Sequence, residues 1–465
     1  MSIIRFVYTA LSLLLCLLFL PLAVAPPLSA GEDIEKIQQF ISEPIFNGQV
    51  YYYESGLENS EILVLLHGVG DEASTIWEPL LPELVGKYHV LALDLPGFGK
   101  STQANLLYSP ENYSAFLYWF IGKHAKGPVH LMGHSLGGAL ALRFAADHPD
   151  KVKRLILVDS IGILHRIAFS KKIMEFDLPL DNWPEIIAAP LQEAIDSIND
   201  FTGSTAEKMT KQGSAEDISK ILSTPVARRI FLRGKSNAIA ALAVTNHDFS
   251  NLLDMVTCET LLIWGENDNI SPVRTGKVLD ALLPHASLVI IPRAGHVPMN
   301  DRRDDFLTAL FAESLPKKTQ RPVSYSKTGR VGSCFNQSGM KFSGVYDRIE
   351  LDQCKDVRIS NVSTEYIAAK DSEIKIENST ITGKAIGLDL NNSKLTGTAL
   401  TITGDIAIHA DKSRLDLAGV TLIGKKYAVT SDDQAILLFS VSRITSLLSD
   451  DYIHGVRKVS PDSPL

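Results

Sequence analysis

The amino-acid sequence predicts two unlike folded parts. The first is an α/β domain with a doubly wound, mostly parallel sheet and a helical cap; the second is a C-terminal all-β domain of the parallel β-helix type. Short apolar runs alternate with helical patterns from Gln49 to about Leu315, which is typical of an α/β sheet. A stretch of about 100 residues between Asp159 and Thr260 carries helical patterns instead of strands. From Val345 onward, a unit of about 20 residues repeats.

The strands expected in the sheet are short apolar runs at Val50–Glu54, Ile62–Leu66, His89–Leu93, Val129–Met132, Leu155–Val158, Thr260–Trp264 and Leu288–Ile291. Several of these runs are nearly continuous in Val, Ile and Leu, as in strands that are buried on both faces of a parallel sheet. Helical patterns lie at Leu136–Asp147 and Asp301–Ser314. The alternation predicts one α/β domain over residues 31–315.

The long segment between two of these strands is too large for a loop in a compact domain. Amphipathic helical patterns fill most of it, for example at Asn182–Ile198 and Ser214–Ile221. We therefore expect a helical cap over about residues 160–255. Its apolar stretches at Ile186–Ala189 and Ala238–Val244 would suit an acyl chain or another apolar group.

The C-terminal repeats share one pattern of short alternating strands and polar turns. Their units begin at Val345, Thr364, Lys384, Asp405 and Lys425. Repetition at this length predicts a parallel β-helix over residues 345–445. The turns contain asparagines, which tolerate a left-handed backbone, at Asn378, Asn391 and Asn392. A polar and basic linker is expected at 316–344 and a tail at 446–465.

Composition excludes one class of partner. The chain has 465 residues, of which 45% are hydrophobic and 21% charged, so it can bury a real core. Its formal net charge is -8. Because binding to a phosphate backbone needs clustered Lys and Arg, we expect no nucleic-acid partner.

Residues 1–30 form a separate segment in which Arg5 is the only charge. An apolar run at Phe6–Leu20 and then small residues follow it, as in a secretory signal that is cleaved after Ala30 or, less favourably, after Ala25. The apolar segment is also just long enough to remain as a membrane anchor. We expect a periplasmic or secreted protein, which contacts a membrane only if this segment is retained.

Three cysteines follow that segment, at Cys258, Cys334 and Cys354. The odd number leaves one thiol unpaired. Cys334 and Cys354 lie about one repeat apart, so a disulfide could join the first rungs of the β-helix. No cysteine spacing resembles a zinc site, and we expect neither a metal nor a cofactor.

The strongest functional signal is the motif Gly133-His134-Ser135-Leu136-Gly137. It comes directly after one predicted strand and directly before a predicted helix, which is the context of a nucleophile elbow. The chain turns sharply there, and side chains two residues before and after the serine would collide, so both are glycine. The helix N-terminus brings free N–H groups beside the serine. We predict that Ser135 is a nucleophile.

A serine hydroxyl is a weak nucleophile until a base takes its proton. His296 follows the last predicted strand of the sheet, and we predict that it is this base. The base needs an acid to hold its tautomer, and Asp268 lies in the loop after an earlier strand. Glu266 in the same loop and Asp159 at the end of another strand are the alternatives.

An acyl transition state also needs hydrogen-bond donors for its oxyanion. One expected donor is the backbone N–H of Leu136. The second should come from the loop after Ile62–Leu66, and we assign it to Val69, with Gly68 as the alternative. The side chains of His67 and His134 are expected to be structural.

These motifs, in this order, resemble the α/β-hydrolase fold superfamily in its esterase-and-lipase-like branch. The matching segments are His67-Gly68, Asp94–Ser101, Gly133–Gly138, Trp264–Asp268 and Gly295-His296. The order Ser135, Asp268, His296 is also the order of that fold. The resemblance covers about Val50 to Leu315 and leaves out the repeats. It implies a carboxylic-ester hydrolase, although relatives also cleave amides, lactones or carbon–carbon bonds.

The sequence therefore predicts an exported serine hydrolase that cleaves a small-molecule or lipid-like ester through an acyl-enzyme on Ser135. An acyltransferase that uses the same residues on a glycan or lipid acceptor is the first alternative. A non-catalytic binding or scaffold protein is the second. The β-helix could contact a polysaccharide or cell surface, or serve as a stabilising or dimerising extension.

Overall fold

The computed structural model describes residues 34–70, 72–165, 222–312 and 325–465. The expected signal segment at 1–30, residues 166–221 of the expected cap and residues 316–324 of the expected linker lie outside this described part. In the described part, no helix is both long and apolar enough to cross a membrane. Residues Ile37–Leu465 form one compact unit.

Within the described residues, eight strands form the first sheet in the order β1-β2-β4-β3-β5-β6-β7-β8. Their bounds are β1 (Ile37–Glu43), β2 (Gly48–Ser55), β3 (Ile62–Leu66), β4 (His89–Leu93), β5 (Val129–His134), β6 (Val152–Val158), β7 (Glu259–Gly265) and β8 (Ala286–Ile291). The pairs β1–β2 and β2–β4 are antiparallel, and the remaining pairs are parallel. The predicted doubly wound, mostly parallel sheet is thus confirmed.

The sequence did not predict β1. This edge strand alternates half-buried and exposed residues, and Phe40 on it is largely exposed. An edge strand has one neighbour and needs no continuous apolar run, so its sequence lacks the signal that marks the central strands. By contrast, the bounds of β3 and β4 agree with the predicted runs.

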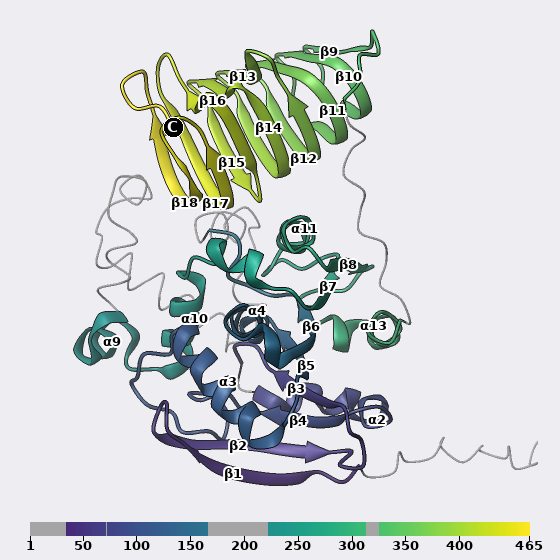
Figure 1. The fold of residues 1–465 in the computed structure, drawn as a ribbon, viewed down its shortest axis with the longest axis vertical. Coiled ribbons are helices and arrows are strands. Elements are labelled where there is room, and N and C mark those ends of the chain that lie inside the picture. The colour runs from purple at the N-terminus through teal and green to yellow at the C-terminus, as the bar shows by residue number, and fades with distance from the viewer. Residues whose placement is uncertain (1–33, 71, 166–221, 313–324) are drawn as a thin grey trace, which may run out of the picture. The chain divides into compact units, whose positions relative to one another are not determined.

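Helices cover both faces of this sheet. In Figure 1 the central strands run between α3 and α4 on one side and α2 and α13 on the other. The helices are α2 (Leu81–Leu84), α3 (Pro110–His124), α4 (Leu136–Asp147), α9 (Pro225–Leu232), α10 (Ser236–Thr245), α11 (Val273–Leu282), α12 (Pro298–Asp301) and α13 (Arg303–Leu310), with 3-10 turns η1 (Ala73–Leu80), η2 (Pro149–Lys151) and η4 (Ser250–Met255). A side-chain cap sets the start of helix α3, because the Ser109 side chain accepts the backbone N–H of Asn112.

The described part of the expected cap consists of α9, α10 and η4. Ile239, Ala240 and Val244 of α10 are fully buried and belong to the same core cluster as α4. Much of the apolar stretch Ala238–Val244 therefore packs into the core instead of offering an open acyl surface. The other apolar stretch, Ile186–Ala189, lies outside the described residues.

The C-terminal domain is all-β, and its strands stack side by side from the green to the yellow end of the chain (Figure 1). They are β9 (Val331–Phe335), β10 (Lys341–Asp352), β11 (Val357–Lys370), β12 (Glu373–Thr382), β13 (Ile386–Asn391), β14 (Lys394–Asp411), β15 (Arg414–Ala418), β16 (Thr421–Thr430), β17 (Ala435–Thr445) and β18 (Asp450–Val459). In the described residues every pairing between them is parallel except β17–β18. Strands β14, β15, β17 and β16 close a ring.

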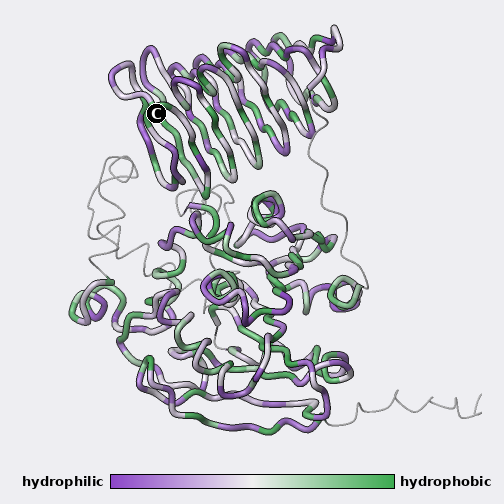
Figure 2. The backbone as a smooth tube through the Cα atoms, viewed as in Figure 1, coloured by the Kyte–Doolittle hydropathy of each residue, from purple (hydrophilic) through white to green (hydrophobic). Residues whose placement is uncertain are grey.

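The register shows the repeat directly. Ile367 pairs with Leu388, Leu388 with Ile408, and Ile408 with Val429, so each residue meets its counterpart about one predicted unit later. All four side chains are fully buried. Hydrophobic and hydrophilic residues alternate along these strands in Figure 2, because successive side chains of a strand point to opposite faces.

The boundaries of this domain differ from those predicted. Strand β9 and the start of β10 lie within the expected linker 316–344, and β18 lies within the expected tail 446–465. The residues of β9 alternate between exposed and buried. Its exposed residues are Val331, Ser333 and Phe335, and a strand of five residues is too short for its alternation to stand out from the polar and basic segment before it.

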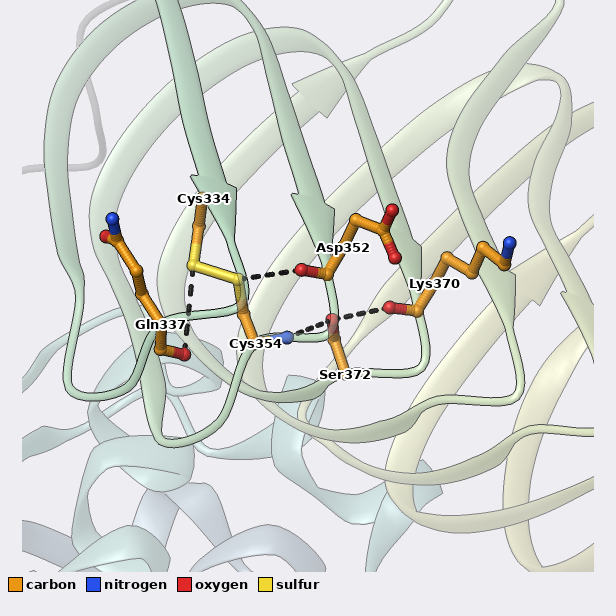
Figure 3. The surroundings of a disulfide bond; sticks show 6 residues. All are labelled: Cys334, Gln337, Asp352, Cys354, Lys370 and Ser372. Atoms are coloured by element: carbon orange, nitrogen blue, oxygen red, sulfur yellow. Dashed lines mark hydrogen bonds between the residues drawn. A yellow bond between two sulfur atoms is a disulfide. The ribbon is translucent and has the colours of Figure 1, made fainter.

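A disulfide joins Cys334 and Cys354 on the first rungs, and Cys258 is a free thiol. Figure 3 shows that the hydroxyl of Ser372 accepts the N–H of Cys354 and donates to the carbonyl of Lys370. The same arrangement recurs one rung further at Ser393 and again at Ser413. This buried serine ladder, which was not predicted from the sequence, satisfies the backbone at successive turns.

Candidate active site

The candidate nucleophile lies at a strained turn between β5 and α4. Ser135 has φ 53 and ψ -114, a conformation that few residues other than glycine adopt. A Cβ on Gly133 would lie 2.2 Å from the carbonyl oxygen of Gly137, and a Cβ on Gly137 would lie 2.3 Å from that of Leu66. The two glycines are therefore required by the close approach of backbone to backbone.

The candidate base enters from the loop between β8 and α12. The Nε2 atom of His296 lies 2.9 Å from Oγ of Ser135. Asp301 holds this loop, because its Oδ2 accepts the N–H of Gly295 at 2.7 Å. The role of Asp301 was not predicted, because no residue pattern around it marks a loop anchor.

The candidate acid comes from the loop after β7. Asp268 Oδ2 lies 2.8 Å from Nδ1 of His296, while its Oδ1 accepts the N–H groups of Ile270 and Ser271. The carboxylate requires a proton on Nδ1, so the Nε2 atom of His296 is left to accept the hydroxyl proton of Ser135. The structure thus brings the three predicted residues together in one hydrogen-bonded row, the Asp268–His296–Ser135 row.

The acid loop has further supports that sequence did not indicate. The indole N–H of Trp264 donates to the carbonyl of Ser271, and the Ser271 hydroxyl donates to the carbonyl of Ser160. These contacts join β7, the acid loop and the segment after β6. They fix the backbone on either side of Asp268.

Neither alternative acid contacts His296 through a hydrogen bond in the described structure. Glu266 accepts the backbone N–H of Arg293 and is exposed. Asp159 is fully buried and accepts the N–H of Gly265 at 2.9 Å. Burial, and next the charge of Asp268, raise the pKa of Asp159 well above its usual range.

The two predicted oxyanion donors belong to segments that border Ser135. Leu136 is the first residue of α4, where backbone N–H groups have no partner within the helix. A Cβ on Gly68 would lie 3.0 Å from Cβ of Ser135, so the loop that carries Gly68 and Val69 lies directly beside the serine. An anion formed at Ser135 would meet this loop and the positive end of the α4 dipole.

The two other histidines near Ser135 make structural hydrogen bonds. His67 accepts the N–H of Leu95 at Nε2 and donates from Nδ1 to the carbonyl of Gly68. His134 donates from Nε2 to the carbonyl of His296 at 2.7 Å. Burial lowers the pKa of His67, and burial followed by the charge of His296 lowers the pKa of His134 to about 3.

One group of side chains in the described residues has the spacing of a metal site, and it lies in the C-terminal domain. The ligand atoms of His409, Asp411 and Asp432 lie within 4.8 Å of one another. The Nε2 atom of His409 lies 3.4 Å from Asp411 and 3.8 Å from Asp432, and its Nδ1 forms a hydrogen bond with Thr430. Asp432 is mostly exposed, and the cluster lies on a polar turn of the β-helix.

Comparisons with known proteins match the sheet domain. The profile of a family described as "Alpha/beta hydrolase family" matches residues 63–309. The chain is 28% identical over 271 residues to a pimeloyl-(acyl-carrier protein) methyl ester esterase of Aliivibrio salmonicida, covering 57% of this chain and 96% of that protein. It is 26% identical over 292 residues to a 2-hydroxy-6-oxo-6-(2'-aminophenyl)hexa-2,4-dienoic acid hydrolase of Metapseudomonas resinovorans, covering 61% and 95%.

Among solved structures, a hydrolase from Pseudomonas aeruginosa PA01 is 23% identical. The superposition has a TM-score of 0.43 and covers 61% of this chain and 98% of that one. The family match ends at residue 309, so the C-terminal β-domain lies outside it.

Proposed function

The chain belongs to the alpha/beta hydrolase family, and from that premise we propose that it is an exported serine hydrolase that cleaves a carboxylic ester. The proposal assigns a covalent acyl-enzyme to Ser135. The single observation that carries it is the hydrogen-bonded Asp268–His296–Ser135 row at a strained strand-to-helix turn.

In this proposal His296 takes the hydroxyl proton as Ser135 attacks the ester carbonyl carbon. The N–H groups of Leu136 and Val69 bind the oxyanion that forms. His296 then gives the proton to the departing alcohol, and the acyl group stays on Ser135. Water, activated by the same histidine, releases the carboxylic acid, while Asp268 holds the histidine and stabilises its charged form.

One comparison favours an ester within the hydrolase class. The relative from Aliivibrio salmonicida is named as a methyl ester esterase. The relative from Metapseudomonas resinovorans is named as the hydrolase of a dienoic acid. Hydrolysis is therefore the general part of the proposal, and an ester substrate is its more specific part.

Export rests on the N-terminal sequence and on the disulfide. Residues 1–30 have the order of a secretory signal. Disulfides persist mainly in oxidising compartments, which agrees with the Cys334–Cys354 bond. For the C-terminal domain we favour a stabilising role over a polysaccharide contact, because Ala418, Leu438 and Val441 of this domain belong to the core cluster of the catalytic domain.

The proposal is tested with the full-length mature protein and nitrophenyl esters of increasing acyl length. Wild type should release nitrophenol with at least one ester, and Ser135→Ala should lose nearly all of this activity. Ser109→Ala, which removes a helix cap away from the site, is the matched control and should keep it. Added acceptor alcohols that divert the acyl group from water would favour the acyltransferase. Equal activity of Ser135→Ala and wild type would contradict the proposal.

A further inference from the structure

A second buried carboxyl group lies behind the candidate acid. Asp159 follows β6 directly, and its backbone N–H donates to the carbonyl of Ile263 on β7. Its φ of 44 lies in the left-handed region, and its side chain is completely buried. Because the Oδ1 atom of Asp159 accepts the N–H of Gly265, the carboxyl group is held where β7 gives way to the loop of Asp268.

The second oxygen of this carboxyl group has no donor. In the described residues, Oδ2 of Asp159 is buried and meets no N–H or O–H group. Asp268 is its neighbour: the backbone N–H of Asp268 donates to the carbonyl of Gly265, the residue whose own N–H donates to Asp159, and the charge of Asp268 raises the pKa of Asp159. Two ionised carboxylates have only acceptors, so a hydrogen bond between these two acids would require a proton on one of them.

The hydrogen-bond partners of Asp159 and Asp268 indicate which of the two acids carries the proton. Asp268 accepts two backbone N–H groups and the Nδ1–H of His296, and all three contacts stabilise its ionised form. Asp159 accepts one backbone N–H. Burying an ionised carboxylate that has only one hydrogen-bond donor costs free energy. A protonated Asp159 would avoid this cost and could donate a hydrogen bond from Oδ2.

We propose that Asp159 is a positioning residue: it stays protonated and donates a hydrogen bond to the carboxylate of Asp268. The proposal rests on the proposed function, because it concerns the acid of that mechanism. The donated hydrogen bond gives Asp268 a fourth partner and holds the carboxylate so that Oδ2 faces His296. Burial, the charge of Asp268 and, more weakly, that of Asp301 all raise the pKa of Asp159.

This role differs from the alternative in which Asp159 itself is the ionised acid that orients His296. A protonated aspartic acid and asparagine have nearly the same shape, and both can accept at one position and donate at the other. Asparagine also tolerates a left-handed backbone, so it suits the φ of residue 159. Asp159→Asn should therefore preserve the contact, while Asp159→Ala should remove it.

The experiment measures the rate of fluorophosphonate labelling and, on an ester that turns over, kcat and KM. Asp159→Asn should remain within about threefold of wild type, because the amide replaces the carboxyl donor. Asp159→Ala should slow labelling about 10- to 100-fold and lower kcat more than it changes KM, because the acid is less well placed. Asp268→Asn, the reference for a lost acid, should fall by about 10⁴-fold.

An Asp159→Asn variant as inactive as Asp268→Asn would overturn the proposal, because it would mean that residue 159 must be ionised. An Asp159→Ala variant with the rate of wild type would also overturn it, because no positioning would then be lost.

A second readout does not depend on activity. An ordinary aspartic acid loses its proton near pH 4 in the unfolded chain, whereas Asp159 keeps it in the folded chain. The unfolded state then binds fewer protons, so Asp159 makes the protein less stable as pH rises. Asp159→Asn removes this effect, and its Tm relative to wild type should rise from about pH 5 to about pH 8. A constant or falling difference would contradict protonation of Asp159.

The two measurements also distinguish a failure of the proposed function from a failure of the proposal for Asp159. Folded wild type that no fluorophosphonate labels would contradict the proposed function. The pH dependence of Tm would then still decide whether Asp159 is protonated.

Discussion

The guanidinium group of Arg274 on α11 binds the carboxylate of Asp416 on β15 at 2.9 Å, 142 residues further along the chain. The same group donates to Thr398 Oγ1 and to the carbonyls of Gly397 and Asp416. Helix α11 begins at Val273, five residues after Asp268. The C-terminal domain is therefore bonded to the helix that follows the acid loop.

Arg274→Ala should destabilise the protein by about 1–3 kcal/mol, because it leaves Asp416 and two carbonyls without their shared donor. Lys277→Ala is the matched control on the same helix. Lys277 also forms an ion pair with the C-terminal domain, through Glu377, but both side chains are about 40% exposed, against 16% and 25% for Arg274 and Asp416. An exposed pair contributes about 0–1 kcal/mol. Urea unfolding measures both variants, and equal losses would contradict the special role of Arg274.

Replacing each of two helical glycines with alanine should change the stability of the protein in opposite directions. Gly137→Ala places a methyl group 2.3 Å from the carbonyl of Leu66, so it should cost about 3 kcal/mol or prevent folding. Gly122 lies on α3 with no atom within 4 Å of the added Cβ. Gly122→Ala should therefore stabilise the protein by up to about 1 kcal/mol, which is the difference in helix propensity. Thermal unfolding of both variants checks the elbow geometry; a stable Gly137→Ala protein would refute it.

His134 should make the protein sensitive to acid. Its pKa is lowered to about 3 in the folded chain, against 6.5 for the unperturbed group. Between these values the unfolded chain binds the proton and the folded chain does not, so stability falls as pH falls. The slope is about 1.4 kcal/mol per pH unit for one proton.

His134→Asn should therefore show a shallower loss of stability than wild type between about pH 6.5 and pH 4.5. Urea unfolding at several pH values in this window provides the comparison. The same slope in both proteins would mean that His134 is not held neutral by burial.

Much of the fold was predictable because its signals are local. Buried parallel strands are continuous apolar runs, and the runs at β3 and β4 gave correct bounds. The β-helix repeats its pattern once per rung, so its period could be read from the sequence and agrees with the pairing of Ile367 with Leu388. The edge strand β1 and the outer strands β9 and β18 lack such signals, because none of them is a continuous apolar run or one of the predicted repeat units.

The three members of the row could be predicted because each follows a strand at the same edge of the sheet. The residues that hold these three in place could not be predicted. Asp301 and Trp264 act through backbone groups that only the folded loops bring near. Asp159 was identified as an acid at a strand end, but its neighbour Asp268 is 109 positions away in the sequence, and no spacing rule relates the two.

The most direct test of the central claim is labelling of the purified, folded protein with a fluorophosphonate probe. Such probes react with a serine that a neighbouring base activates. Wild type should be labelled on Ser135, and both Ser135→Ala and His296→Gln should remain unlabelled while still folding. Absence of labelling in folded wild type, or labelling that persists in Ser135→Ala, would contradict an activated serine at this position.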